Sequence, residues 1–134
     1  MRNYIFSIIS VFLFATFFIS CADKNPPRDE IPRIKETMAK FSQAIKDRSR
    51  AGIDSLLVVQ ALDLGYSSDR ILSDIYPGNS GTFYAFGAKT FTYTKDAAKV
   101  DCTIMADSTD SGRPLEITLV KSGDNWFVKR FDLK

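Results

Sequence analysis

The chain has 134 residues, of which 45% are hydrophobic, and a formal net charge of +2 from 18 basic and 16 acidic side chains. This composition excludes a disordered or collagen-like chain, and the length suits one domain with a hydrophobic core but not two. The near balance of charge gives no indication of a nucleic-acid-binding surface. The sequence contains no histidine, which excludes catalytic triads and metal sites built on that residue.

The first 21 residues have the features of a bacterial lipoprotein signal peptide. Arg2 supplies the positive charge, and the mostly apolar run from Tyr4 to Ile19 is short for a membrane span. The sequence Phe18-Ile19-Ser20-Cys21 is similar to a lipobox, although Phe18 stands where that motif usually has leucine. An uncleaved anchor and an ordinary secretory signal are the alternatives. We expect residues 1–21 to be a lipoprotein signal, with palmitate-type acyl chains on Cys21 holding the protein on a membrane.

The segment after the signal places the domain near that membrane. We interpret residues 22–28 as a tether, in which Pro26-Pro27 keeps a helix from starting. The expected location is the bacterial cell envelope, with the domain of residues 29–134 facing the periplasm or the exterior. No nucleic-acid partner is expected there. The second cysteine, Cys102, is expected to be a small buried hydrophobe without a disulfide.

Three helices are expected at the start of the domain. The first runs over residues 30–46 along a single apolar stripe. The second begins at a cap on Ser49 and ends at Gly65, a natural C-terminal glycine. The third is short, begins at Ser67 or Ser68 and stops at the following Pro-Gly pair. The stripe of the first helix consists of Ile31, Ile34, Met38, Phe41 and Ile45.

Four antiparallel strands are expected to follow. The first runs over 82–94, and the next two, over 98–106 and from Leu115 to Lys121, alternate apolar and polar residues as strands with one buried face do. Gly123-Asp124 then forms a two-residue turn that places Lys121 opposite Trp126. The predicted inner face consists of Val100, Cys102, Ile104, Leu115, Ile117 and Leu119.

The last strand contains a conflict between its register and its charges. If the register from the turn continues, Arg130 and Asp132 face inward, and burying two charges without good partners is costly. A β-bulge near Lys129 would instead turn Phe131 into the core. Two other solutions remain open, namely a polar site of Arg130 and Asp132 inside the fold and an outer apolar face covered by a second copy or a partner. That outer face would consist of Met105, Val120, Phe127 and Phe131.

Three helices before a four-stranded meander predict an α+β fold, with N-terminal helices packed on a curved antiparallel sheet. AIKDRSRAGIDSLL, DAAKVDCTI and LEITLVKSGDNWFVKRF resemble the corresponding parts of the NTF2-like (cystatin-like) superfamily, in particular its small bacterial lipoproteins. The resemblance covers residues 30–133. It implies a cone-shaped roll that holds a small apolar ligand or an active site in some relatives and only mediates contacts in others.

The sequence gives little support to catalysis. Enzymes of this superfamily usually place an aspartate inside the cone, whereas the predicted inner face carries no carboxylate. The calcium-like run from Asp107 to Gly112 is better explained as a polar loop, because Thr118 stands where a calcium loop needs glutamate. We expect neither a metal nor a cofactor.

The favoured function is therefore a non-enzymatic domain that binds an envelope protein or a second copy of itself. The alternative is a carrier or sensor that holds a small apolar ligand in the cone. Aromatic residues near the Gly/Pro loop, including Tyr66, Phe83 and Phe86, either line the mouth of such a cavity or pack as an ordinary rim. The candidate ligand or partner residues are Tyr76, Tyr84, Tyr93, Trp126, Phe127, Arg130 and Asp132.

Overall fold

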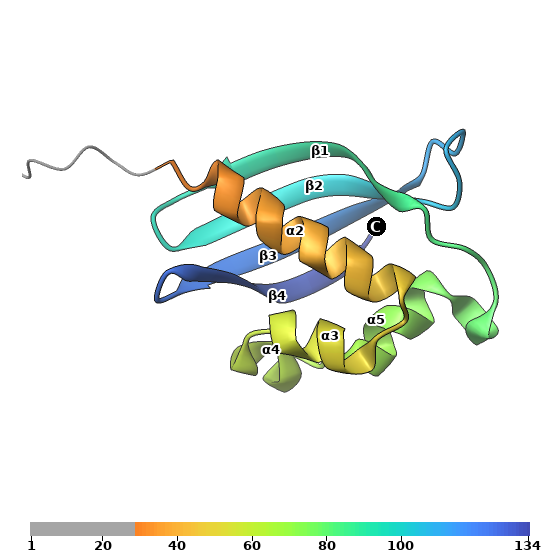
Figure 1. Ribbon diagram of the computed structural model, residues 1–134, viewed down its shortest axis with the longest axis horizontal. Helices are drawn as coiled ribbons and strands as arrows, with labels where there is room; N and C mark the ends of the chain where they lie inside the picture. Colours follow the sequence, from red (N-terminus) through yellow and green to blue (C-terminus); the bar gives the residue numbers. More distant parts are fainter. Residues whose placement is uncertain (1–28) are drawn as a thin grey trace, which may run out of the picture.

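The computed structural model describes residues 29–134, which form helices packed on a sheet (Figure 1). The helices are α2 (Ile31–Lys46), α3 (Arg50–Leu56), α4 (Val59–Asp63) and α5 (Ser68–Ile75), followed by a short 3-10 helix, η1 (Pro77–Asn79). The strands are β1 (Ala85–Tyr93), β2 (Ala97–Met105), β3 (Arg113–Ser122) and β4 (Asn125–Leu133). The predicted signal, the tether and Cys21 lie outside the described residues.

The predicted fold class is confirmed. The sheet is antiparallel with the strand order β1-β2-β3-β4. Helix α2 crosses one face of this curved sheet, and α3, α4 and α5 lie beyond α2 on the side of β4 (Figure 1). Within residues 29–134, no helix is both long enough and apolar enough to cross a membrane.

The core lies between α2 and the inner face of the sheet. Phe41 on α2 is fully buried, and its ring centroid lies 6.0 Å from those of both Phe86 and Phe131. Burying a side chain of this size contributes about 1.5–3 kcal/mol. All six residues predicted for the inner face are buried, as is the predicted α2 stripe apart from the half-buried Ile31. Burial also raises the pKa of the Cys102 thiol to about 11, which keeps it protonated and unreactive.

The prediction of one continuous second helix is wrong. The helix ends at Leu56, and Leu57 forms an isolated parallel bridge with Val128 of β4. The Val58 N–H donates to the Val128 carbonyl at 2.9 Å, whereas a continuing helix would direct it to Asp54. The edge of β4 thus interrupts the helix, and the chain restarts as the separate short helix α4.

The structure resolves the conflict in β4 by the predicted β-bulge. Leu119 pairs with Val128 but Thr118 pairs with Arg130, so Lys129 is the extra residue. Phe131 turns inward and is only 1% exposed, which removes it from the proposed outer apolar face. The predicted pairing of Lys121 with Trp126 across the two-residue turn is confirmed. A polar Arg130–Asp132 site inside the fold is contradicted, because Arg130 is exposed and Asp132 is half-buried on the other face.

Candidate functional site

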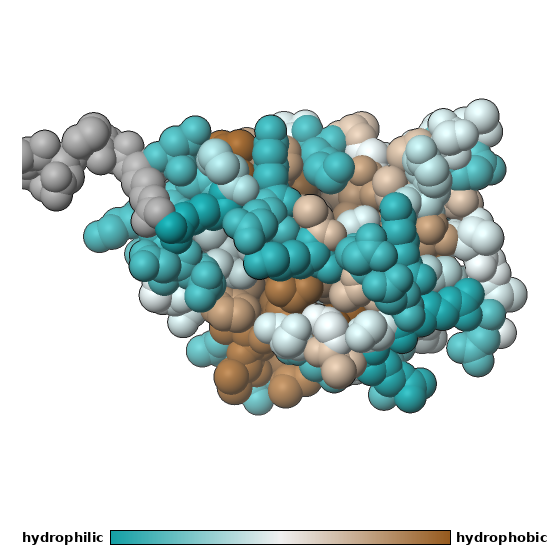
Figure 2. All heavy atoms as spheres, in the orientation of Figure 1, coloured by the Kyte–Doolittle hydropathy of each residue, from teal (hydrophilic) through white to brown (hydrophobic). Residues whose placement is uncertain are grey.

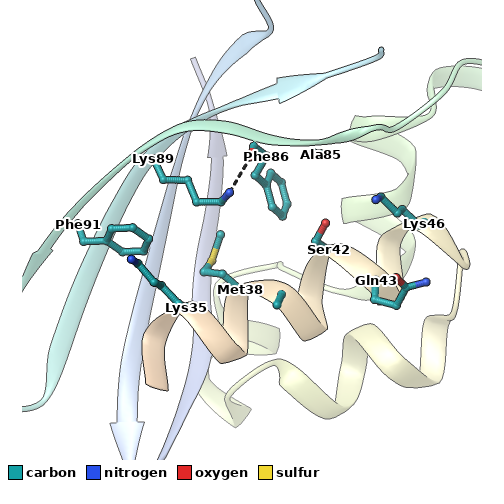
Figure 3. Close-up of a pocket in the computed structure, with 10 residues that line it drawn as sticks. Lys35, Met38, Ser42, Gln43, Lys46, Ala85, Phe86, Lys89 and Phe91 are labelled. Carbon is teal, nitrogen blue, oxygen red and sulfur yellow. Dashed lines mark hydrogen bonds between the residues drawn. The ribbon is translucent and has the colours of Figure 1, made fainter. Parts of the chain in front are cut away.

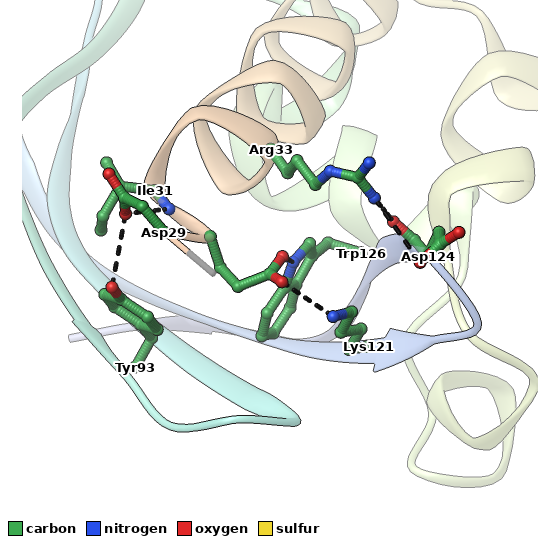
Figure 4. A network of polar contacts seen from close by, with 8 residues as sticks. Asp29, Ile31, Arg33, Tyr93, Lys121, Asp124 and Trp126 are labelled. Carbon is green, nitrogen blue, oxygen red and sulfur yellow. Dashed lines mark hydrogen bonds and ion pairs between the residues drawn. The ribbon is translucent and has the colours of Figure 1, made fainter. Parts of the chain in front are cut away.

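A buried acidic residue at the start of α2 holds the β3–β4 hairpin (Figure 4). Glu30 is only 4% exposed. Its carboxylate accepts hydrogen bonds from Lys121 Nζ at 2.8 Å and from Trp126 Nε1 at 2.9 Å. Nearby, Arg33 forms an ion pair with Asp124 in the hairpin turn, at 3.9 Å. These contacts stabilise the position of α2 on the sheet, and the candidate Trp126 that takes part in them is only 3% exposed.

Sequence reasoning did not find Glu30, because its partners lie 91 and 96 residues away along the chain. A signal was present in the predicted turn, which pairs Lys121 with Trp126, because an ammonium and an indole N–H that become buried need an acceptor. The candidate Tyr93 lies at the same end of the fold. Its side chain is 39% exposed, and its hydroxyl donates to Asp29 at 3.4 Å.

Three further candidates lie on β4. Arg130 and Asp132 form an ion pair at 3.3 Å, and the buried Tyr66 hydroxyl donates a hydrogen bond to Asp132. Burial, together with the Asp132 carboxylate, raises the pKa of Tyr66. Phe127 is half-buried opposite Val120. The hydrogen bond between Tyr66 and Asp132 attaches the chain after α4 to the edge of the sheet.

The remaining candidates, Tyr76 and Tyr84, lie near the Gly/Pro loop. Tyr76 is buried, its hydroxyl donates to the Ile45 carbonyl at 3.1 Å, and the Arg48 guanidinium lies 4.0 Å from its ring centroid. Tyr84 is 48% exposed, with Lys46 5.8 Å from its ring centroid. The other rim aromatics, Tyr66, Phe83 and Phe86, are buried. The candidate residues therefore do not form one site.

A groove of about 580 Å³ lies between α2 and β1. Three lysines lie beside the apolar side chains that form its floor (Figure 3). None of the ten residues found to line it within the described range is acidic. They are Lys35, Met38, Ala39, Ser42, Gln43, Lys46, Ala85, Phe86, Lys89 and Phe91.

The lysines lie at both ends of this α2–β1 groove. Lys35 and Lys89 are at the Phe91 end and Lys46 is toward the other end (Figure 3). Lys35 Nζ lies 5.7 Å from the Phe91 ring centroid, and Lys89 Nζ donates to the Phe86 carbonyl at 2.8 Å. Both contacts are ones that a bound anion can replace or share, because a cation prefers a carboxylate or phosphate to a ring or a neutral carbonyl.

Local irregularity of β1 explains the position of Lys89. The pairing with β2 shifts between Gly87 and Thr90, and Ala88 adopts a φ of 47°. A Cβ on Gly87 would approach Met105 Sδ to 2.4 Å, so a larger residue would require the Met105 side chain to shift. Lys89 was not among the residues predicted from the sequence. A shift in strand pairing interrupts the alternation of side chains, so the sequence does not specify which face the next side chain lies on.

The two groove lysines on α2 could have been recognised from their spacing in the sequence. Lys35 and Lys46 are 11 residues apart, close to three turns of helix or about 16 Å along one face. That spacing marks a basic face of α2, but only the structure shows that β1 lies beside it. In residues 29–134, no group of three or more acidic, cysteine or histidine side chains is arranged to hold a metal ion.

Comparison with known proteins identifies the fold. No family model matches the sequence, and no curated protein matches it. An Ntf2-like protein involved in plasmid conjugation is similar in structure, with a TM-score of 0.55 and 18% identity over 82% of this chain and 41% of that one. A candidate dehydratase of the NTF2-like family from Streptomyces avermitilis has a TM-score of 0.50 and 17% identity over 76% of this chain and 93% of that one. The chain thus spans less than half of the first protein, and it has the NTF2-like fold.

Proposed function

We propose that this chain is a lipid-anchored binding protein of the bacterial cell envelope, whose domain binds a small amphipathic anion in the α2–β1 groove without converting it. The observation that carries the proposal is the combination of an apolar floor with three lysines and no acidic lining residue in the described structure. A ligand with an apolar body and one carboxylate or phosphate head complements such a groove.

The two parts of the groove supply different contributions. The floor of Met38, Phe86 and Phe91 removes apolar ligand surface from water, at about 25 cal/mol per Å². The lysines attract the head group and orient it. The contacts of Lys35 with the Phe91 ring and of Lys89 with the Phe86 carbonyl support this role, because both partners line the groove.

The function favoured from the sequence, binding of an envelope protein or of a second copy, has less support. The outer apolar face that could have served such binding loses Phe131 to the bulge. The two structural relatives differ in their described roles, and a shared fold does not determine function. The groove is therefore the stronger basis for a function, and binding of a second copy is an outcome that the tests below distinguish.

Replacing both Lys35 and Lys89 with glutamine should weaken binding of dodecanoate about tenfold, because two charges next to the carboxylate are lost. Isothermal titration calorimetry with the purified protein measures the change. Dodecanol, which lacks the charge, should bind the wild type and the variant equally. Lys40→Gln is the matched control, since Lys40 is on the same helix but pairs with Glu36 at 2.8 Å outside the groove. Equal weakening by Lys40→Gln, or no binding of dodecanoate to the wild type, would contradict the groove as the site.

Replacing Cys21 with serine should remove the protein from the membrane fraction or leave it unprocessed, because the thiol to which the lipid is attached is lost. Fractionation, gel mobility and intact mass measure the result. Cys102→Ser is the matched control, since Cys102 is a buried free thiol in the domain. Lipid anchoring is wrong if the Cys21→Ser protein fractionates and migrates like the wild type.

A further inference from the structure

Exposed apolar side chains gather on α4. The exposed large hydrophobic residues of the described chain number five, and three of them fall within six positions on and just after this helix. They are Val59 (76% exposed), Leu62 (59%) and Leu64 (47%). Figure 2 shows the corresponding hydrophobic patch at the lower left, over α4. We call these three residues the α4 patch.

The fold holds this patch outward. The bridge between Leu57 and Val128 ends α3 and fixes where α4 begins. Within α4 itself only Ala61 is buried, and the next buried anchor is Tyr66, whose N–H donates to the Ala61 carbonyl at 2.9 Å. The exposure therefore follows from backbone pairing on both sides of the helix and does not depend on the conformation of a single side chain.

The α4 patch lies at the end of the domain where the chain enters. Val59 lines a shallow hollow together with Lys121 and Lys129, next to the β3–β4 turn. That turn is tied by Asp124 to Arg33 in the first turn of α2. Figure 1 accordingly shows α4, the β3–β4 turn and the start of α2 toward the same end of the molecule.

The distance to the predicted anchor is short. Asp29 follows Cys21 by eight residues. Eight residues span at most about 29 Å when fully extended. A domain attached through Cys21 is therefore kept within reach of the lipid surface, at the end that carries the α4 patch.

We propose that the α4 patch rests on the lipid surface to which the chain is anchored, with Val59, Leu62 and Leu64 inserted shallowly at the boundary between head groups and acyl chains. This inference rests on the lipid anchoring proposed above. Lys129, beside Val59, faces anionic head groups at this boundary. The exposed carboxylate of Asp63 keeps α4 at the boundary, because an acidic side chain does not enter the hydrocarbon.

A lipid surface fits this patch better than a second copy of the chain. A stable dimer buries about 800 Å² on each partner, which three side chains on one short helix do not supply. An anchored domain needs only a weak additional contact, because the anchor already gives a high local concentration at the membrane. The patch then sets the orientation of the domain and adds little to its attachment.

The experiment places a fluorophore on the full-length, lipidated protein in phosphatidylethanolamine–phosphatidylglycerol vesicles. Leu62→Cys carries an environment-sensitive nitrobenzoxadiazole label in the patch. Ser111→Cys is the matched control, because Ser111 is exposed in the β2–β3 loop at the opposite end of the domain. The unsubstituted protein measures any background labelling of the buried Cys102. A nitroxide on the lipid acyl chain near the head group serves as the quencher.

We expect the label at position 62 to shift to shorter wavelength and to lose most of its emission to the lipid nitroxide, and the label at position 111 to do neither. Water-like emission at position 62 would overturn the proposal. A shifted but unquenched emission would also overturn it, because the patch would then be covered by protein. Flotation of the wild type with the vesicles tests the lipid anchoring separately. If the protein floats but the label at position 62 is not quenched, only the proposed contact of the α4 patch with lipid is refuted. If the protein does not float, the lipid anchoring is refuted as well.

Discussion

Replacing Phe131 with alanine should lower the free energy of unfolding by about 3–5 kcal/mol, the usual cost of removing a large core side chain. Phe131 is 1% exposed and packs edge-on against Phe41. Alanine would leave a cavity between α2 and β4 that close-packed neighbours fill only in part. Urea unfolding of the purified protein, followed by the emission of Trp126, the single tryptophan, measures the loss.

Phe127→Ala is the matched control for this measurement. Phe127 lies on the same strand and is half-buried, but it sits before the bulge at Lys129. Its removal should therefore cost clearly less than that of Phe131. A larger loss from Phe127→Ala would mean that the strand runs without the bulge, so the comparison tests the register of β4 as well as the core.

Replacing Glu30 with alanine should lower the free energy of unfolding by about 3 kcal/mol, because breaking a buried ion pair leaves the partner charge and a buried donor without their acceptor. The side chains of Glu30 and Lys121 are only 6% and 18% exposed. The buried indole N–H of Trp126 loses its carboxylate at the same time. The same urea experiment gives the free energy, and a red shift of the Trp126 emission would report the altered environment.

Glu36→Ala is the matched control on the same helix. Glu36 pairs with Lys40 at 2.8 Å, but both side chains are 63% exposed, and solvent-exposed pairs contribute little. If Glu30→Ala costs no more than Glu36→Ala, the buried pair does not hold α2 on the hairpin. Glu30→Gln is informative in addition, since it keeps an acceptor for Trp126 while removing the charge.

The α2–β1 groove and the α4 patch lie beside opposite edges of the sheet. The groove is beside β1, whereas α4 contacts β4, and these strands are the two ends of the strand order. A ligand in the groove and a lipid surface on α4 would therefore not compete for the same residues. Substitutions that weaken one interaction should leave the other unchanged.

The sequence by itself determined the fold class and the inner face. Alternation along β2 and β3 and the spacing of the α2 stripe are set by backbone geometry, so residues such as Val100, Ile117 and Phe41 are buried as predicted. The two-residue turn at Gly123-Asp124 determined the pairing of Lys121 with Trp126. The bulge in β4 was one of three solutions that the sequence left open, because continuing the register would have buried two charges.

Only the tertiary structure decided the features that depend on contacts between distant segments. The local sequence predicts that the second helix continues past Leu57. The Val128 carbonyl, which competes as a hydrogen-bond acceptor, is available only because β4 lies beside this segment. Glu30 looks like an ordinary helix-start residue until the hairpin brings Lys121 to it. The groove likewise needs β1 beside α2 to bring Lys89 to the same end as Lys35. Local propensity and periodicity specify which face of an element is buried. Packing, and the need of buried polar groups for hydrogen-bond partners, decide which groups from different elements come into contact.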